Sequence, residues 1–262
     1  MTVFQSIILG VLQGLTEFLP ISSSGHLVLA ETFWIPNIDV SALQGFDIVL
    51  HAGTLLALLI IYWRTWLRLL RSPFTRDGKH QLLLITLIVA TVPAALAGFF
   101  FEDMISSALR SENAVGLALI LTGLVLILGE RYNRKSDSVK APSTLNSFWI
   151  GCAQACALVP GLSRSGLTIS AGRMVGLSRS EALDFSFLMA VPIIAGATLL
   201  TFHDVLTSQV VLPAQQIVIS GFIASLVASV LAIRLLRRWV ARHSFAWFAL
   251  YLLPVGAYLV MS

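Results

Sequence analysis

The chain has 262 residues, of which 57% are hydrophobic and only 11% are charged, and its mean hydropathy is +0.87. A soluble domain carries about 25% charged residues, so this composition excludes an ordinary soluble protein and indicates a polytopic membrane protein. The net charge of +4 does not indicate a nucleic-acid partner, because the basic residues fall in short loops between apolar segments.

The chain begins with residues 1–40, an apolar segment that polar residues interrupt midway. Six uninterrupted apolar segments follow, each long enough to cross a bilayer, which takes about 20 residues. A second interrupted segment, residues 146–182, separates the third span from the fourth. The predicted spans are residues 42–63, 82–101, 113–129, 183–202, 214–233 and 245–261.

Lysine and arginine are distributed unevenly among the loops. Loops 64–80, 131–145 and 234–244 carry five, four and four of these residues, whereas loop 102–112 carries one and loop 203–213 carries none. Short cytoplasmic loops are enriched in lysine and arginine. The three basic loops are therefore predicted to face the cytoplasm, and the two poor loops the outside.

This orientation predicts that residues 146–182 form a re-entrant helical hairpin. The segment starts in the cytoplasm and the span after it also starts there, so the chain must return to the side from which it entered. We expect the break near Pro160-Gly161. By analogy, residues 1–40 form a second hairpin that breaks near Pro20 and opens outward, with one simple crossing as the alternative there.

The two interrupted segments share a pattern that indicates an internal repeat. We therefore predict an all-α fold with inverted topology, made of a first half, residues 1–140, and a second half, residues 141–262. Each half contains one hairpin and three spans, and such folds place their site where broken helix ends meet at mid-membrane. The matching motifs are Gly10-x-x-Gln13, Pro20 and Ser22-Ser-Ser-Gly25 in the first half, and Gly151-x-x-Gln154, Pro160 and Ser163-Arg-Ser-Gly166 in the second.

Gln13 and Glu17 are spaced to share one helix face. A carboxylate within a membrane segment is costly and usually functional. Carboxylate and amide oxygens suit a hard divalent cation, which often shares its ligand shell with substrate phosphates. We predict a cation site for Mg²⁺ or Ca²⁺ here, with an ion pair between Glu17 and Arg164 as the structural alternative.

The residues after Pro20 are typical of a turn that binds an anion. A returning helix that starts at Ser22-Ser23-Ser24-Gly25 would direct backbone N–H groups and hydroxyls at one point. His26 follows directly and can act as acid, base or nucleophile near neutral pH. A histidine satisfied within the core is the alternative.

The second interrupted segment supplies an arginine surrounded by hydroxyls and glycine. Arg164 offers a planar fork that matches phosphate oxygens, and Ser163, Ser165, Gly166 and Thr168 add donors. A buried structural ion pair is the alternative. Together the two segments provide a nucleophile or base, a cation site and a phosphate clamp, which is the set of groups that phosphoryl transfer requires.

The runs Glu17–His26 and Pro160–Ile169 closely resemble the two signatures of the bacterial undecaprenyl-diphosphate phosphatases, also called bacitracin-resistance proteins. The resemblance covers essentially the whole chain in length, span pattern and motif spacing. It implies removal of the terminal phosphate from undecaprenyl diphosphate, which yields the carrier lipid of peptidoglycan synthesis and confers bacitracin resistance. It also implies a cation-dependent hydrolase of the bacterial inner membrane, with a site that opens to the periplasmic face.

Residue roles follow from this resemblance. Glu17 would be a metal ligand or acid/base, Ser23 or His26 the nucleophile, and Arg164 the phosphate clamp; water activated by His26 is a third nucleophile. The resemblance implies that Ser22, Ser163, Ser165 and Thr168 are supporting donors, and the turn pattern adds Ser24, Gly25 and Gly166 as predicted substrate-binding residues.

The chain departs from the family pattern at Gln13, where members commonly carry a second glutamate. Loss of that charge should weaken a site built on two carboxylates. Either Gln13 ligates the cation through its amide oxygen, or the cation relies on Glu17 and the diphosphate.

Other charged residues allow simpler interpretations. Asp47 and His51 either line the entrance to the site or pair with each other. Glu130, with Arg131 and Arg134, is typical of a charge cluster at a helix end.

The main rival function is an inverted-repeat transporter or flippase for a polyprenyl phosphate lipid, because broken helices are also a transporter signature. The discriminating feature is chemical, since a carrier does not need a carboxylate, an imidazole and a guanidinium on one phosphate. The expected partners are the polyprenyl diphosphate and membrane lipids, with no nucleic acid, and assembly as a homodimer is a further option.

Overall fold

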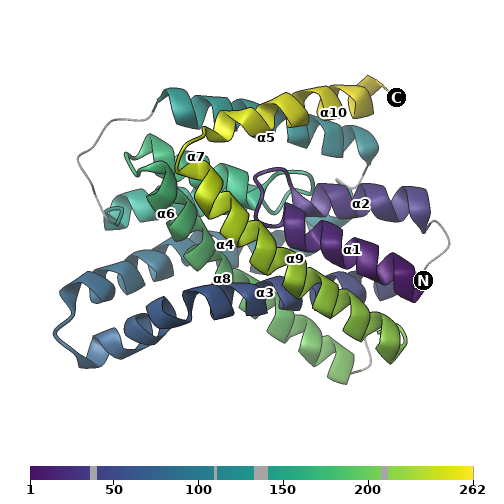
Figure 1. Ribbon diagram of the computed structural model, residues 1–262, viewed down its shortest axis with the longest axis horizontal. Coiled ribbons are helices and arrows are strands. Elements are labelled where there is room, and N and C mark those ends of the chain that lie inside the picture. Colours follow the sequence, from purple (N-terminus) through teal and green to yellow (C-terminus); the bar gives the residue numbers. More distant parts are fainter. Residues whose placement is uncertain (36–39, 109–110, 133–140, 208–211, 262) are drawn as a thin grey trace.

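A computed structural model describes residues 1–35, 40–108, 111–132, 141–207 and 212–261. Within these ranges the chain forms ten α-helices and two short 3-10 helices, and no strand (Figure 1). Five helices in the same ranges are long and apolar enough to cross a membrane. The protein is thus an all-α polytopic membrane protein, as the composition predicts.

These five helices match the first five predicted spans, and each continues past the predicted carboxyl-terminal end. The predicted bounds stop at the first charged residues, whereas α3 (Val40–Arg71) continues through Arg64 and Arg68. Arginine is a good helix former whose stem lies along apolar surface, so a charge at the membrane boundary does not end the helix. The five helices are α3 (Val40–Arg71), α4 (Gly78–Ala108), α5 (Glu112–Arg131), α8 (Arg179–Leu206) and α9 (Gln215–Val240).

The sixth predicted span, residues 245–261, is divided and short. It contains the 3-10 helix η2 (Phe245–Phe248) and the 13-residue helix α10 (Ala249–Met261). α10 lies along α5 (Figure 1), and the two backbones meet closely, because a Cβ added to Gly256 would stand 2.6 Å from the carbonyl oxygen of Gly116. This apolar segment is shorter than the five helices that qualify as spans.

Each interrupted segment forms two helices joined by a turn, and each breaks where the sequence predicts. Proline lacks a backbone N–H and clashes with the preceding turn of a helix, and a proline lies in both connections. Pro20 lies between α1 (Val3–Thr16) and α2 (Ser23–Trp34), and Pro160 lies between α6 (Thr144–Cys156) and α7 (Arg164–Met174).

The second helix of each hairpin has the same type of cap. The hydroxyl of Ser22 accepts from the N–H of Gly25 at 3.2 Å, and the hydroxyl of Ser163 accepts from the N–H of Gly166 at 3.1 Å. Such caps satisfy N–H groups that a helix start leaves unpaired. Ser22 has a φ of 74°. Residues other than glycine rarely adopt this backbone conformation, and it is often found at functional sites.

Hairpins and spans pack through glycines that allow close backbone contact. α1 lies against α9, and a Cβ on Gly10 or Gly14 would stand 2.5 Å from a carbonyl oxygen of α9. α6 lies against α4, where a Cβ on Gly151 would stand 2.4 Å from the carbonyl oxygen of Ala90. Small residues are the usual means by which membrane helices approach closely.

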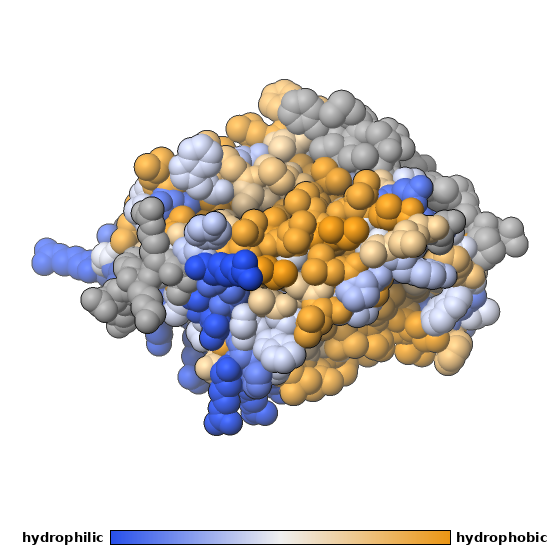
Figure 2. Space-filling model, turned by 90° about the horizontal axis from the view of Figure 1, so that it is seen from above, coloured by the Kyte–Doolittle hydropathy of each residue, from blue (hydrophilic) through white to orange (hydrophobic). Residues whose placement is uncertain are grey.

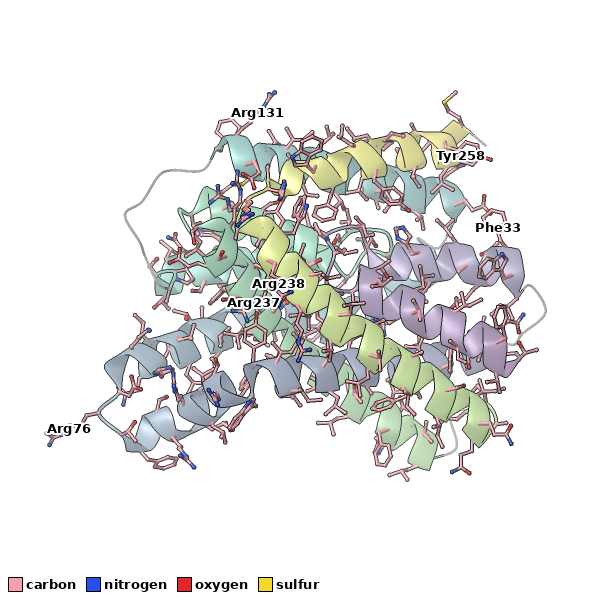
Figure 3. The ribbon with its side chains drawn as sticks, in the orientation of Figure 1. Phe33, Arg76, Arg131, Arg237, Arg238 and Tyr258 are labelled. Atoms are coloured by element: carbon pink, nitrogen blue, oxygen red, sulfur yellow. The ribbon has the colours of Figure 1, made fainter. Side chains whose placement is uncertain are left out.

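The surface separates into a hydrophobic area and a basic end. Figure 2 shows hydrophobic side chains over the middle of one face and hydrophilic ones concentrated at its left. In Figure 3, Arg76, Arg131 and Arg238 lie in the left half of the molecule, whereas Phe33 and Tyr258 lie at the right. The labelled arginines of the three basic loops thus lie in the half of this view opposite Phe33 and Tyr258. A broad exposed hydrophobic area is what a lipid-facing surface requires.

The charge cluster at Glu130 differs from the sequence-based expectation. Glu130 accepts hydrogen bonds from Arg179 at 2.9–3.1 Å and pairs with Arg173 at 3.5 Å, whereas Arg131 points outward (Figure 3). Arg134 lies outside the described residues. Neighbours in sequence are exposed on different sides of a helix, so the carboxylate pairs with α7 and α8 instead.

Candidate active site

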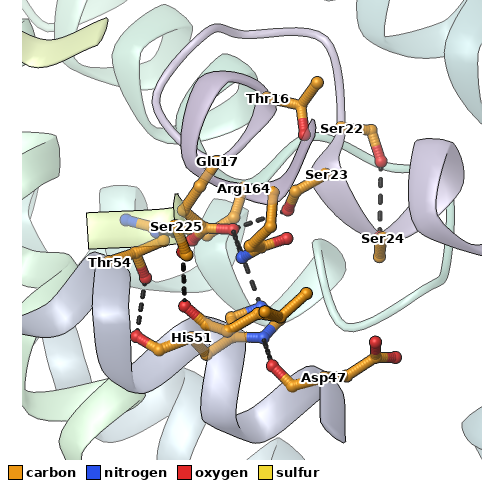
Figure 4. Close-up of polar contacts among 12 residues, drawn as sticks. Thr16, Glu17, Ser22, Ser23, Ser24, Asp47, His51, Thr54, Arg164 and Ser225 are labelled. Atoms are coloured by element: carbon orange, nitrogen blue, oxygen red, sulfur yellow. Dashed lines mark hydrogen bonds and ion pairs between the residues drawn. The ribbon is translucent and has the colours of Figure 1, made fainter. Parts of the chain in front are cut away.

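The two polar turns meet at Glu17, which follows α1 and is only 8% exposed. One carboxylate oxygen pairs with the guanidinium of Arg164, 147 positions away. The other accepts from the hydroxyl of Ser23 at 2.6 Å and from Nε2 of Gln13 at 3.1 Å, and Nε2 of His51 stands 3.7 Å from it. In Figure 4 the side chains of Ser23, Arg164 and His51 converge on Glu17 from both hairpins and α3.

The turn that carries Glu17 is anchored by the residue beside it. Phe18 is fully buried and packs edge-to-face on Phe187 of α8, with ring centroids 5.2 Å apart. The burial of one aromatic ring contributes roughly 1.5–3 kcal/mol. The carboxylate is therefore attached to a fixed region of the core.

Backbone and hydroxyl contacts join the two turns. The hydroxyl of Ser165 donates to the carbonyl oxygen of Leu19 at 3.2 Å, and the N–H of Gly161 donates to the hydroxyl of Ser24 at 3.4 Å. Gly25 lies close enough to this turn that a Cβ there would stand 3.2 Å from the Cα of Gly161. The two hairpins thus hold each other in register beside the carboxylate.

The start of α7 is held by α8. The hydroxyl of Thr168 donates to the carbonyl oxygen of Arg164 at 2.8 Å and contacts the hydroxyl of Ser186 at 2.7 Å. The guanidinium also reaches the backbone carbonyl of Ser186 at 3.5 Å. These contacts hold both the backbone and the guanidinium of Arg164 in place.

A cavity of about 250 Å³ lies between the two turns. Of the residues predicted for the site, it is lined by Glu17, Ser23, Ser24, Ser163 and Arg164. Drug-sized pockets measure roughly 300–1,000 Å³, so this space suits a head group and not a long lipid tail.

Several other predicted site residues shape the turns without lining this cavity. Their hydrogen bonds, described above, cap α2 and α7, connect the two turns or fix Arg164 through its backbone. They are Ser22, Gly25, Ser165, Gly166 and Thr168.

His26 takes a different direction from the other predicted catalytic residues. Its Nδ1 lies 2.7 Å from the carbonyl oxygen of Ser22, and its Nε2 lies 2.7 Å from the hydroxyl of Tyr251 in α10. The two rings stack with an interplanar angle of 21°. The residues lining the 250 Å³ cavity do not include His26, and its catalytic role stays a prediction.

Comparisons with known proteins identify the family of the chain. The family description for bacitracin resistance protein BacA matches residues 6–258. The chain belongs to the BacA family. It is 40% identical over 260 residues to the undecaprenyl-diphosphatase of Desulforudis audaxviator, covering 98% of this chain and 96% of that protein. It is 42% identical to the undecaprenyl-diphosphatase of Rubrobacter xylanophilus, covering 97% and 95%. The family resemblance of the two motifs is thus confirmed.

The BacA site has few of the usual metal ligands. Among the described residues, no group of three histidine, cysteine, aspartate or glutamate side chains lies close enough to hold a metal. However, Oε1 of Gln13 is buried without a hydrogen-bond partner, and the amide of the same residue contacts Glu17. The amide nitrogen, and not Oε1, faces the carboxylate. A half-turn of the amide would bring Oε1 beside Glu17, and the two oxygens would then fit a hard cation that takes its remaining ligands from phosphate and water.

Sequence reasoning did not place three groups in this BacA cavity. His51 remained undecided between two interpretations, whereas Gln154 and Thr198 were not considered as site residues; all three line the cavity. The repeated motif could have indicated Gln154, because Gln154 occupies the position that Gln13 occupies in the first motif. Thr198 lies within an apolar helix, where no local pattern distinguishes it.

Proposed function

We propose that this chain is an undecaprenyl-diphosphatase, which hydrolyses the terminal phosphoanhydride bond of undecaprenyl diphosphate to give undecaprenyl phosphate and inorganic phosphate. The full-length similarity to relatives of that name supports the activity. The observation that carries it is the convergence of Glu17, Ser23 and Arg164 on one head-group-sized cavity. The product is the carrier lipid of peptidoglycan synthesis, and its regeneration confers resistance to bacitracin.

Arg164 binds the terminal phosphate in this mechanism. Its planar fork matches two phosphate oxygens, and its present anionic partner is Glu17. Phosphate entering the cavity competes for the guanidinium, which frees one carboxylate oxygen at the moment the substrate is bound. Preorganised positive charge then stabilises the charge that spreads over the transferring phosphoryl group.

Ser23 is the best-placed nucleophile. Its hydroxyl donates to Glu17 at 2.6 Å, which is within the reach that a nucleophile and its general base require. Oxygen of Ser23 attacks the terminal phosphorus, the bond to the bridging oxygen breaks, and the proton passes to Glu17. The departing lipid phosphate takes this proton, which returns Glu17 to its ionised form. Water then attacks the phosphoserine and gives its proton to the same carboxylate, the bond between phosphorus and the Ser23 oxygen breaks, and Glu17 returns the proton to that oxygen as inorganic phosphate leaves. Direct attack by water, and attack by His26, are the alternatives.

A divalent cation, Mg²⁺ or Ca²⁺, completes the proposed site. Glu17 and Oε1 of Gln13 would hold it, and it would neutralise the charge of the diphosphate. The chain's own residues bind and orient the head group, while the apolar helices next to the cavity accommodate the start of the lipid tail. The tail itself lies against membrane lipid, and the assembly of two copies is not required for this chemistry.

We propose an inverted-topology repeat of residues 1–140 and 141–262, with two re-entrant hairpins and six crossings. The packing supports it, because each hairpin lies against the second span of the other half: α1 on α9, and α6 on α4. The third crossing of the second half is residues 245–261, whose 17 residues are at the lower limit for a span. The positive-inside rule places the basic loops in the cytoplasm of a bacterial inner membrane, with the site opening to the periplasm.

The packing of each hairpin against the other half also favours a second candidate function, a flippase or secondary transporter for a polyprenyl phosphate lipid. Inverted-topology repeats are common in transporters. Purified protein with Mg²⁺ and a polyprenyl diphosphate separates the two functions. We expect release of inorganic phosphate by wild type and its loss in Arg164→Ala. A matched control is Arg237→Ala, which removes an arginine paired with Asp184 on another surface. No release with any divalent cation, combined with lipid exchange across proteoliposomes, would support the carrier instead.

A terminally labelled substrate tests the role of Ser23. We expect acid quenching to trap label on the protein in wild type and not in Ser23→Ala. Full activity without any trapped label, retained in Ser23→Ala, would assign the attack to water.

A further inference from the structure

The cavity contains polar groups that neither the motifs nor the proposed mechanism uses. Gln154, in α6, is only 2% exposed, and neither its amide nitrogen nor its amide oxygen has a hydrogen-bond partner among the described residues. The hydroxyl of Thr198, in α8, is also buried and unpaired within the same ranges. Both residues line the same cavity as Glu17 and Arg164. Burying an unsatisfied polar group is unfavourable, so these groups require an explanation.

The surroundings of Gln154 and Thr198 differ from those of the catalytic groups. Ala157, Leu158, Ile194 and Ala197 are among the apolar residues that line the cavity with them. The charged groups, by contrast, come mainly from the two turns. The cavity therefore has a charged region and an apolar region, and the apolar region contains a pair of polar side chains that lack partners among the described residues.

A lipid diphosphate has a matching polarity. Its terminal phosphate is free and highly charged, whereas its proximal phosphate is esterified to the apolar chain. When the terminal phosphorus is held at Ser23 and Arg164, the proximal phosphate must face the region of the cavity from which the lipid leaves. Apolar side chains suit that region, and a few placed donors are enough to fix the orientation of a ligand.

We propose that Gln154 and Thr198 form a subsite for the proximal phosphate, the one that stays on the lipid after hydrolysis. This inference rests on the proposed function. The amide nitrogen and the hydroxyl donate to oxygens of the proximal phosphate, and thereby place the bridging oxygen opposite the attacking group. Neutral donors bind phosphate more weakly than charged ones, which allows the lipid monophosphate to leave.

Product inhibition distinguishes the charged and apolar regions of the cavity. A short-chain lipid monophosphate, farnesyl phosphate, occupies the proximal subsite, whereas inorganic phosphate occupies the subsite at Arg164. We expect Gln154→Leu to raise the inhibition constant of farnesyl phosphate by about 10-fold, the effect of losing one hydrogen bond to a charged group. The inhibition constant of inorganic phosphate should stay within about 2-fold, since Arg164 is unchanged.

Two further variants guard against loss of folding. Thr198→Val preserves the side-chain shape and should shift the same constant in the same direction. Ser229→Ala is the control, because it also removes a buried hydroxyl without a partner among the described residues, at the contact of α9 with Gly14 and not at the cavity. It should leave both inhibition constants unchanged.

A binding readout needs no turnover. Farnesyl phosphate should raise the melting temperature of wild type more than that of Gln154→Leu, because a ligand stabilises the state that it binds. Equal shifts in the two proteins, or equal changes in both inhibition constants, would overturn the subsite while leaving the hydrolase intact. Absence of phosphate release from wild type would instead overturn the proposed function, and the melting shift would still decide whether Gln154 binds the lipid phosphate.

Discussion

Replacing Glu17 with glutamine should make the protein unstable in the absence of phosphate and stable in its presence. Glu17 and Arg164 form an ion pair whose side chains are only 7% and 16% exposed. Breaking such a pair by removing one partner typically costs about 3–5 kcal/mol, because the other charge remains buried without compensation. The remaining guanidinium has one backbone contact, with Ser186 at 3.5 Å, which neutralises no charge.

Inorganic phosphate can take the place of the missing carboxylate. In wild type a phosphate ion must displace Glu17 from Arg164, whereas in Glu17→Gln no anion competes for the guanidinium. A ligand at 100 times its dissociation constant adds about 2.7 kcal/mol of stability, so saturating phosphate should recover most of the loss. The assay is thermal unfolding in detergent, with and without phosphate, at matched ionic strength to keep screening constant.

The double variant Glu17→Gln/Arg164→Gln is the matched control. It contains neither charge, so it should be more stable than Glu17→Gln and should gain nothing specific from phosphate. If wild type, Glu17→Gln and the double variant respond equally to phosphate, then Arg164 does not bind it, and the clamp in the proposed mechanism is incorrect.

Three further variants test the nucleophile, the packing and the cation site. Ser23→Ala should lower kcat by on the order of 10²–10⁴-fold, and Ser24→Ala by much less, in steady-state phosphate release. Gly151→Ala should lower thermal stability by about 1–3 kcal/mol because its Cβ would stand 2.4 Å from the α4 backbone; Gly98→Ala, facing open space in the same bundle, should not. Gln13→Glu should lower the Mg²⁺ concentration for half-maximal activity; an unchanged metal titration would place the cation elsewhere.

Local sequence signals were sufficient for the breaks and for most of the spans. Pro20 and Pro160 each stop a helix for a reason contained in the residue itself, and five long apolar stretches became long helices. The ion pair between Glu17 and Arg164 was likewise among the sequence-based predictions, as the structural alternative at Glu17, because buried charges at membrane depth pair with one another.

Local sequence patterns could not predict contacts between residues that are far apart in the sequence. The orientation of His26 is set by Tyr251, 225 positions away, and the partners of Glu130 come from two other helices. Gln154 lies in the site because α6 packs on α4 through Gly151. No periodicity in one segment encodes which face another segment will present.

The packing of α1 against α9 has a consequence for biogenesis. α1 packs against α9 through glycines, and α9 is synthesised some 200 residues after α1. The amino-terminal hairpin therefore has no α9 to pack against, in the translocon or the lipid, during most of synthesis. A truncated or stalled chain would contain the acidic group without its guanidinium. Such a fragment should be inactive as a hydrolase, and co-expressed segments 1–140 and 141–262 should regain activity only by assembling together.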